Sequence, residues 1–365
     1  MMHPRQPRSL LPHFLAVLYG LSIVYASLQP FAPWIAPAPG TPFFLWAPWP
    51  TYGTRFDVIA NVVAYIPLGF FVALVPRRRR PAGRLSLAIA VGATLSFAIE
   101  SLQMFVPSRD ASIVDLISNT SGATLGGALA IAFARSAAAR RSVASLRERW
   151  FLPGRIGDLG LALLVIWLAV QVNPGIPLFA TMFEATPTPE VLAGTEVAPN
   201  GDLVAALVEG AHSGFQLLGV GLFLALLVRN RRFAGGAILL LIGIALVVKG
   251  VAATVLLKPT VWSHWLSPGV STGVAVGALV LLAAIWLPRP VQVAVATVAL
   301  LSSLLTTLLA PDLLFARPPL SQFSWSYGHL LNFNGLTHMV LLAWPVVASA
   351  YLFALAGRPR WGEPT

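Results

Sequence analysis

The sequence predicts an all-α polytopic membrane protein with about ten transmembrane helices, and three observations lead to this fold class. Of the 365 residues, 57% are hydrophobic and only 10% are charged, whereas charged residues make up roughly a quarter of an ordinary soluble domain. The mean hydropathy is +0.78. Apolar stretches near the 20 residues that cross a bilayer recur along the chain. A water-soluble core of this composition would leave too little polar surface to cover it, so a soluble enzyme, a disordered tail and a coiled coil are excluded.

The first predicted span follows two arginines, Arg5 and Arg8. The Pro-rich run after it lacks a clean small-residue cleavage site, so we interpret it as an anchor rather than a cleaved signal peptide. The ten predicted spans lie at residues 11–29, 57–75, 85–106, 111–134, 156–173, 204–228, 233–257, 269–287, 291–310 and 336–356. When alternate loops are placed in the cytoplasm, 19 of the 24 Lys and Arg residues fall on that side. This distribution satisfies the positive-inside rule and predicts that both termini are cytoplasmic.

The net charge of +11 would suggest a nucleic-acid partner in a soluble chain. Here the basic residues form short clusters between apolar runs, as topology signals and contacts with anionic lipid headgroups do. No polar domain is large enough to hold a nucleic-acid groove, so we expect no nucleic-acid partner. The chain has no Cys, which excludes disulfide and thiolate chemistry.

The predicted outward loops are rich in Pro and aromatic residues, above all in residues 30–55 and 311–335. Trp and Tyr side chains are favoured at the headgroup level of a bilayer. Two interpretations stay open: these loops anchor the protein at the interface, or they form a lid or groove over a substrate in the outer leaflet. The acidic loop at 174–203 is expected to be a solvated connector.

A weak internal repeat runs through the chain. Residues 57–80 align with 209–232 at an offset of 152, and Gly122 and Gly126 align with Gly273 and Gly277 at an offset of 151. Such repeats are common in membrane proteins. The sequence therefore predicts a degenerate 4+4+2 arrangement, with segments at 1–155, 156–290 and 291–365.

The polar residues of the first predicted segment gather near the outward ends of three spans. Residues three or four positions apart share one helix face, and at 1.5 Å rise per residue the three faces reach a similar depth. These residues are Asp57, Asn61, Glu100, Gln103, Arg109, Asp115 and Asn119. An ionisable group inside a span is expensive when alone, so such groups normally face one another or a wet cavity. We therefore expect an outward-facing polar site.

A purely structural interpretation is also available for these residues. Arg109 would then neutralise one carboxylate, and the amide side chains would join helices. This interpretation leaves at least two of Asp57, Glu100 and Asp115 without a cationic partner, so a functional site accounts for the pattern better. Gly122 and Gly126 form a GxxxG step that allows helices to approach closely.

The motifs also resemble those of a known family. The runs D57-xxx-N61-xxx-Y65-x-P67-x-G69, E100-xx-Q103-xxxxx-R109 and D115-xxx-N119-xx-G122-xxx-G126 resemble the VanZ-like family over residues 11–134. That family is named for an accessory membrane protein associated with resistance to the glycopeptide teicoplanin. The resemblance implies an integral protein of the cell envelope, in the cytoplasmic (inner) membrane of a bacterium, and adds Tyr65 to the site residues. It supplies no reaction.

The second predicted segment has lost this chemistry. Glu209 replaces Asp57 in register and Ser213 replaces Asn61, while Lys249 falls close to the position of Glu100. We expect Glu209 and Lys249 to form one intramembrane ion pair. The histidines His212, His264, His329 and His338 are scattered singly, without metal-ligand spacing. No nucleotide, nucleophile-elbow or heme motif is present, and neither a cofactor nor a metal is expected.

Three functions remain open on these residues. In the leading hypothesis, the outward pocket binds or modifies the polar head of a lipid-linked or peptidoglycan-related molecule. If the pocket is catalytic, Glu100 or Asp115 would be the general base and Arg109 would hold a phosphate or carboxylate. A transporter or flippase for a lipid or small molecule is the second hypothesis, and a non-catalytic membrane scaffold is the third.

Overall fold

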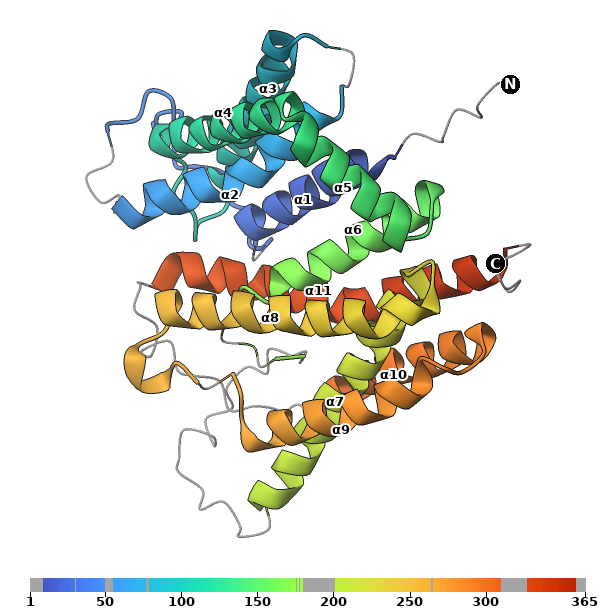
Figure 1. The fold of residues 1–365 in the computed structure, drawn as a ribbon. Coiled ribbons are helices and arrows are strands. Elements are labelled where there is room, and N and C mark those ends of the chain that lie inside the picture. Colours follow the sequence, from blue (N-terminus) through green and yellow to red (C-terminus); the bar gives the residue numbers. More distant parts are fainter. Residues whose placement is uncertain are drawn as a thin grey trace, which may run out of the picture. The chain divides into compact units, whose positions relative to one another are not determined.

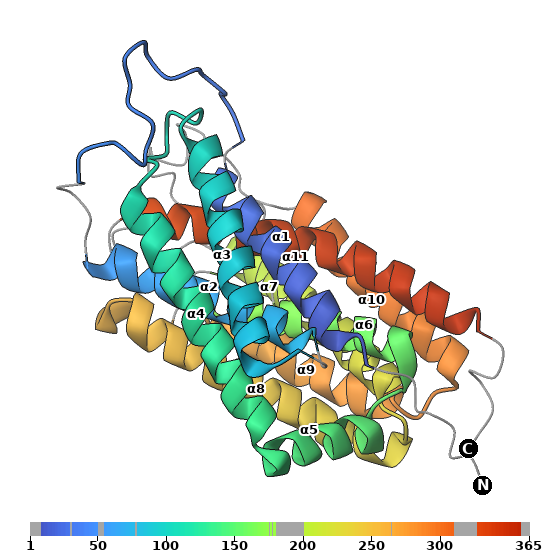
Figure 2. The same cartoon turned by 90° about the horizontal axis from the view of Figure 1, so that it is seen from above.

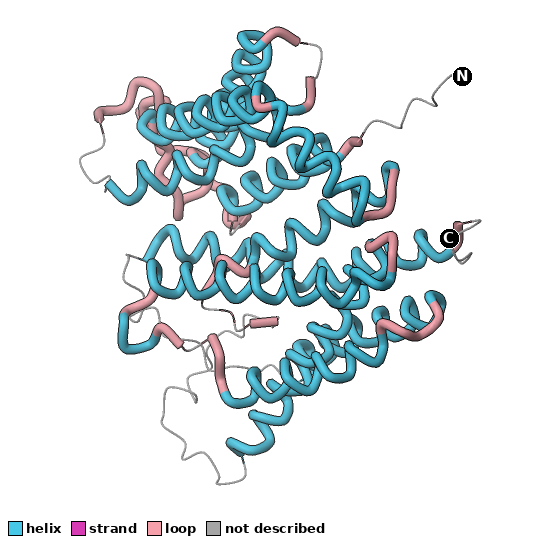
Figure 3. Tube along the Cα trace, viewed as in Figure 1, coloured by secondary structure: helices cyan, strands magenta, loops and turns pink. Residues whose placement is uncertain are grey.

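The computed structural model describes residues 9–29, 31–49, 55–76, 79–174, 176, 178–179, 201–263, 265–309 and 327–358. Within these ranges the regular structure is helical and there is no β-sheet (Figure 3). The α-helices are α1 (Leu11–Leu28), α2 (Arg55–Leu74), α3 (Pro81–Gln103), α4 (Ile113–Arg135), α5 (Ala137–Trp150), α6 (Gly154–Val170), α7 (Gly201–Leu227), α8 (Ala234–Leu256), α9 (Pro268–Ala284), α10 (Arg289–Leu309) and α11 (Tyr327–Ala356). Two 3₁₀ turns, η2 (Arg231–Phe233) and η3 (Pro259–Val261), flank α8.

The all-α fold class is confirmed for the described residues. Eight helices are long and apolar enough to cross a membrane, namely α1, α2, α3, α4, α7, α8, α10 and α11. The helices α6 and α9 have 17 residues each, slightly short of the usual length of a span. Each predicted span therefore coincides with one helix, while the count of ten spans stays a prediction. Residues 137–150, which carry four arginines between two predicted spans, form the additional helix α5.

The chain separates into two compact units, Met1–Glu148 (unit 1) and Arg149–Thr365 (unit 2). In unit 1, α2 packs along α4, and α3 lies beside both (Figure 2). The helix α1 completes the unit by packing on α2 and α3. Local signals fix the ends of the helices: Pro81 occupies the first turn of α3, and the Ser112 hydroxyl caps α4 by accepting a hydrogen bond from the Val114 N–H at 3.1 Å.

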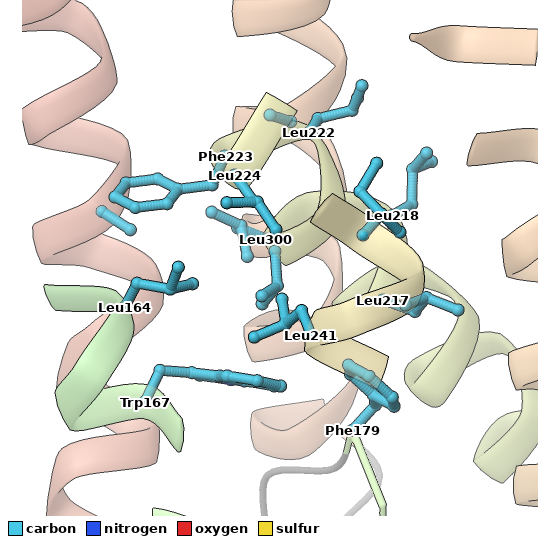
Figure 4. Close-up of a cluster of buried hydrophobic side chains, with 14 of the residues drawn as sticks. Leu164, Trp167, Phe179, Leu217, Leu218, Leu222, Phe223, Leu224, Leu241 and Leu300 are labelled. Atoms are coloured by element: carbon cyan, nitrogen blue, oxygen red, sulfur yellow. The ribbon is translucent and has the colours of Figure 1, made fainter. Parts of the chain in front are cut away.

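Unit 2 is built around α7, which packs on α9 and on α10 (Figure 1). The helix α11 packs on α10 and α6. The core of unit 2 is a cluster of large side chains, among them residues of α6, α7, α8 and α10 (Figure 4). Phe179, from the segment after α6, belongs to this core, and its ring stacks on that of Trp167 with 5.3 Å between the ring centroids.

Both units contain a seam of glycines where two helices touch through their backbones. In unit 1, a Cβ added at Gly122 would overlap the carbonyl oxygen of Val62, and one at Gly126 would overlap that of Ile66. In unit 2, a Cβ at Gly273 would overlap the carbonyl oxygen of Gly210. The α2–α4 pair and the α7–α9 pair therefore both depend on the absence of a side chain.

Candidate functional site

The close approach of α2 and α4 brings their polar residues into direct contact. The side-chain amide of Asn61 on α2 donates to Oδ1 of Asp115 on α4 at 2.7 Å. One turn further along α4, the Asn119 amide donates to the hydroxyl of Ser96 on α3 at 3.0 Å. These two bonds connect α2, α3 and α4 side by side at one end of unit 1. Asp57, half-buried in the first turn of α2, is placed one turn before Asn61.

The second acid of the cluster, Glu100, is only 2% exposed. Its Oε2 accepts a hydrogen bond from the backbone N–H of Ser112, the residue that caps α4, at 2.9 Å. Asp115 lies in the first turn of the same helix. The amino end of an α-helix carries a partial positive charge, so α4 stabilises both carboxylates. Among the described residues, Glu100 has no Lys or Arg partner.

One buried polar atom of the cluster, Oδ1 of Asn119, has no hydrogen-bond partner within the described part of the chain. The buried Tyr65 hydroxyl interacts with the Ser96 side chain, and Tyr65 interacts electrostatically with Glu100 and Asp115. A buried unsatisfied polar group is destabilising by about 1–3 kcal/mol, and native structures retain few of them. The cluster therefore offers one donor-acceptor hydroxyl, one acceptor and a carboxylate.

Gln103 and Arg109 are directed to a different place, the carboxyl end of α1. The Gln103 amide donates to the Ser27 carbonyl at 2.8 Å. Arg109 donates through Nη2 to Ala26 at 2.9 Å and through Nε to Gln29 at 3.0 Å, both at backbone carbonyls. A cation is favourable at the carboxyl end of a helix. Arg109 therefore caps α1 and does not neutralise a carboxylate as the structural interpretation proposed, and burial lowers the pKa of Arg109.

The guanidinium of Arg109 is only partly occupied by this cap. Its third nitrogen, Nη1, makes no hydrogen bond with the residues that the structure describes. Arg109 lies in the turn between α3 and α4, three residues before the Ser112 cap. The turn thus carries both a cation at the end of α1 and the N–H that binds Glu100.

The loop at 31–49 folds over the carboxyl half of α3. The Ile35 N–H donates to the Phe105 carbonyl at 2.8 Å, and the rings of Phe43 and Phe44 pack on Phe97 at 6.1 and 5.8 Å. The indole rings of Trp46 and Trp49 in this loop remain exposed. The structure thus combines an aromatic contact on α3 with exposed tryptophans, and both interpretations of the loop stay open.

The structure adds residues that the sequence analysis did not single out. Ser96 is fully buried and joins α3 to α4 through Asn119. It lies four residues before Glu100, so a polar stripe on α3 could have indicated it. Ser112 contributes a backbone N–H, for which the sequence has no signal. Within the described residues, no group of three or more His, Cys, Asp or Glu side chains could hold a metal ion.

The ion pair predicted for unit 2 is wrong. The Lys249 ammonium donates to the backbone carbonyls of Asn173 and Ile176, at 2.8 Å each. Glu209 instead accepts a hydrogen bond from the hydroxyl of Ser267 at 2.6 Å. The acceptors for Lys249 are thus two carbonyls of the segment that follows α6, whereas those for Arg109 belong to the carboxyl end of α1.

Four further polar residues of unit 2 join α7 to α10. Nδ1 of His212 lies 2.8 Å from the hydroxyl of Thr306, and the Ser303 hydroxyl donates to Oε1 of Gln216 at 2.8 Å. His264 lies outside the described residues, and so do residues 180–200 and 310–326, which hold most of the two other predicted loops. The side chain of His329 is likewise outside them.

The fold and this cluster define a polytopic helical membrane protein with a polar site in its first four helices. Residues 13–134 match the family model VanZ/LLP1, so the N-terminal third of the chain is similar to that family. The match covers α1 to α4 and with them every predicted site residue. No curated protein and no solved structure matches the chain.

Proposed function

We propose that this protein acts in the bacterial cell envelope and that the polar cluster of unit 1 binds the polar head of a lipid-linked or peptidoglycan-related molecule. One observation carries the proposal: Oδ1 of Asn119 is buried without a hydrogen-bond partner among the described residues, in the same cluster as the buried Tyr65 hydroxyl and the Glu100 carboxylate. A head group rich in hydroxyl and amide groups would satisfy Oδ1 of Asn119 and offer donors to the other two groups. The acyl or polyprenyl part of such a molecule would remain in the bilayer.

The same residues support a chemical step on the bound head group. Glu100 or Asp115 is the general base, because each carboxylate is held at the amino end of α4 without a cation bonded to Glu100. Nη1 of Arg109 is available to a phosphate or carboxylate of the ligand. The resemblance to the VanZ-like family supports a link between this activity and glycopeptide (teicoplanin) resistance.

Lipid extraction together with one substitution tests the site. Glu100→Gln keeps the shape of the side chain and an acceptor for the Ser112 N–H but removes the charge. We expect the purified wild-type protein to retain a lipid-linked molecule that mass spectrometry identifies, and the variant to lose it while melting like the wild type. The matched control is Glu209→Gln in unit 2, which should retain the molecule.

Complementation extends the test to the cell. A deletion strain that carries Glu100→Gln should have the glycopeptide susceptibility of the deletion, whereas Glu209→Gln should restore the wild-type value. Full complementation by Glu100→Gln would refute the functional site and favour the third hypothesis, a scaffold that acts through membrane-protein partners. Loss of folding in Glu100→Gln, seen as a lower melting temperature, would indicate a purely structural carboxylate.

A transporter or flippase is the second candidate function, and the two glycine seams favour it. The α2–α4 and α7–α9 contacts use Gly122 and Gly273, which align at an offset of 151 in the sequence. A further parallel is a cation that binds backbone carbonyls, those at the end of α1 in unit 1 and those of the segment after α6 in unit 2. These parallels support a 4+4+2 repeat, and repeats are frequent in transporters. A secondary transporter should stop when the proton gradient is collapsed, whereas an enzyme should continue.

The topology belongs to the same proposal: ten spans in the cytoplasmic membrane, with both termini in the cytoplasm. Tags placed after residue 365 and within residues 77–84 should report the cytoplasm, and a tag within 185–200 should report the outside. A cytoplasmic signal from 185–200 would contradict the ten-span arrangement and the outward position of the site.

A further inference from the structure

We infer that α5 is a membrane-surface helix that lies in the plane of the bilayer and binds anionic phospholipid headgroups. This role is independent of the polar cluster in unit 1, and α5 lies beyond the residues that match the VanZ/LLP1 family. The evidence is the distribution of its residues around the helix, their exposure, and the surroundings of its last turn.

The residues of α5 separate into an apolar face with basic flanks. At 3.6 residues per turn, Ala139, Val143 and Leu146 fall within an arc of about 60°. Arg140 and Arg147 lie on one side of this arc, and Arg149 lies on the other. A helix with an apolar face and flanking arginines is typical of segments that lie in the membrane interface. The long arginine side chains then reach the phosphates while the apolar face enters the acyl region.

The apolar face has no protein covering it in the described structure. No residue of α5 is buried, and Val143 and Leu146 are 55% and 56% exposed. The helix has only 14 residues, too few to cross a bilayer, and four of them are arginines. Because it connects two helices of the membrane fold, α4 and α6, a position at the bilayer surface is the one that satisfies both its polar and its apolar residues.

Trp150, the last residue of α5, belongs to unit 2 and lies at the basic end of that unit. The carbonyl of Trp150 accepts from the Arg229 N–H at 2.9 Å, and the ring of Trp150 packs on Phe233 at 5.2 Å. The Leu152 N–H donates to the carbonyl of Leu227, the last residue of α7, at 2.9 Å. Arg231 and Arg232, which follow α7 directly, are at this end too.

The arginines of α5 indicate that its partner is negatively charged. A leaflet that contains anionic phospholipids attracts such clusters, and each arginine near its surface strengthens binding about fivefold at physiological salt. Nucleic acid would also attract the arginines but would leave the apolar face in water. A membrane of anionic phospholipid satisfies both properties of α5.

The chain has no Cys, so single-cysteine labelling tests the proposal directly in the full-length protein. Leu146→Cys places a fluorophore on the apolar face, and Ala144→Cys places one on the opposite face, only two residues away. The proteins are reconstituted in vesicles of phosphatidylcholine and phosphatidylglycerol. Brominated lipid and aqueous acrylamide are the two quenchers. We expect the lipid to quench Leu146→Cys more strongly and acrylamide to quench Ala144→Cys more strongly.

Recognition of the anionic headgroup is measured by changing which lipid carries bromine. At equal mole fractions, brominated phosphatidylglycerol should quench Leu146→Cys about twice as strongly as brominated phosphatidylcholine, or more, because the arginines enrich anionic lipid around α5. Replacing Arg140, Arg147 and Arg149 together by Gln should bring this ratio to one. The matched triple Lys variant keeps the charge and should retain the enrichment, and its melting temperature should equal that of the Gln variant.

Three results would overturn the proposal. Equal quenching of the two labels by acrylamide would show that α5 lies in water. A ratio of one between the two brominated lipids in the wild-type background would exclude anionic recognition. Protection of Leu146→Cys from both quenchers, together with a dimer mass by light scattering, would show that a second copy of the chain covers the face.

Discussion

The glycine seam of unit 1 leads to the sharpest prediction, since one added methyl group should disturb the whole polar cluster. In Gly122→Ala, the new Cβ would overlap the carbonyl oxygen of Val62 and lie 3.0 Å from the Cβ of Tyr65. Ordinary contacts begin at 3.4 Å, so α2 and α4 must move apart. Their separation stretches the bond between Asn61 and Asp115, which is 2.7 Å long.

The magnitude follows from three contributions. Overpacking destabilises by about 1–3 kcal/mol, and loss of an interhelical hydrogen bond in a membrane protein adds about 0.6 kcal/mol. Exchanging Gly for Ala inside a helix stabilises the helix by about 1 kcal/mol, because Ala has the higher helix propensity. We therefore expect Gly122→Ala to destabilise unit 1 by about 0.6–2.6 kcal/mol and to weaken binding at the cluster.

The assay is thermal unfolding in detergent, followed through the fluorescence of the 11 tryptophans, with lipid retention measured on the same samples. Gly20→Ala on α1 is the matched control, because its Cβ would meet only the Leu68 side chain, at an ordinary 3.7 Å. Gly20→Ala should melt at or above the wild-type temperature. If Gly122→Ala also melts like the wild type and keeps its lipid, backbone contact between α2 and α4 does not position the site.

Three further predictions concern the helix ends and the second seam. Arg109→Gln removes charged donors from the carbonyls at the end of α1 and should destabilise the protein by about 1–3 kcal/mol in the same melting assay; an unchanged melting temperature would contradict the cap. Lys249→Met should lower the melting temperature, and adding Glu209→Gln should not restore it; recovery in the double variant would support the ion pair. Gly273→Ala should destabilise unit 2 whereas Gly243→Ala, which meets nothing within 4 Å, should not; equal melting of the two would refute the α7–α9 seam.

The features that the sequence predicted well are those set by composition and spacing. The apolar runs place the helices because a backbone in hydrocarbon must satisfy its own hydrogen bonds. Residues spaced by four, such as Asp115 and Asn119, lie on one face of α4 and contact neighbouring helices as expected. The glycine spacing of Gly122 and Gly126 likewise predicted a close helix contact.

The features that the sequence did not predict depend on backbone groups. Lys249 was expected to bind the carboxylate of Glu209, and the structural interpretation paired Arg109 with a carboxylate, but both side chains bind backbone carbonyls. A carbonyl carries no signature in the residue letters. The N–H of Ser112 that binds Glu100 is hidden for the same reason. The contact of His212 with Thr306 was missed because it joins residues 94 positions apart, and spacing rules describe neighbours only.

These backbone contacts change how the buried charges of unit 1 can act. Had Arg109 bound Glu100 directly, the carboxylate would be neutralised by a partner that a ligand would need to displace. Instead the acids lie at the positive end of α4, and the arginine lies at the negative end of α1. Helix ends carry only partial charges and stabilise both groups without occupying all their hydrogen-bonding positions. The carboxylate and the guanidinium thus remain separately available, which a site that binds a polar head group requires and a structural ion pair does not.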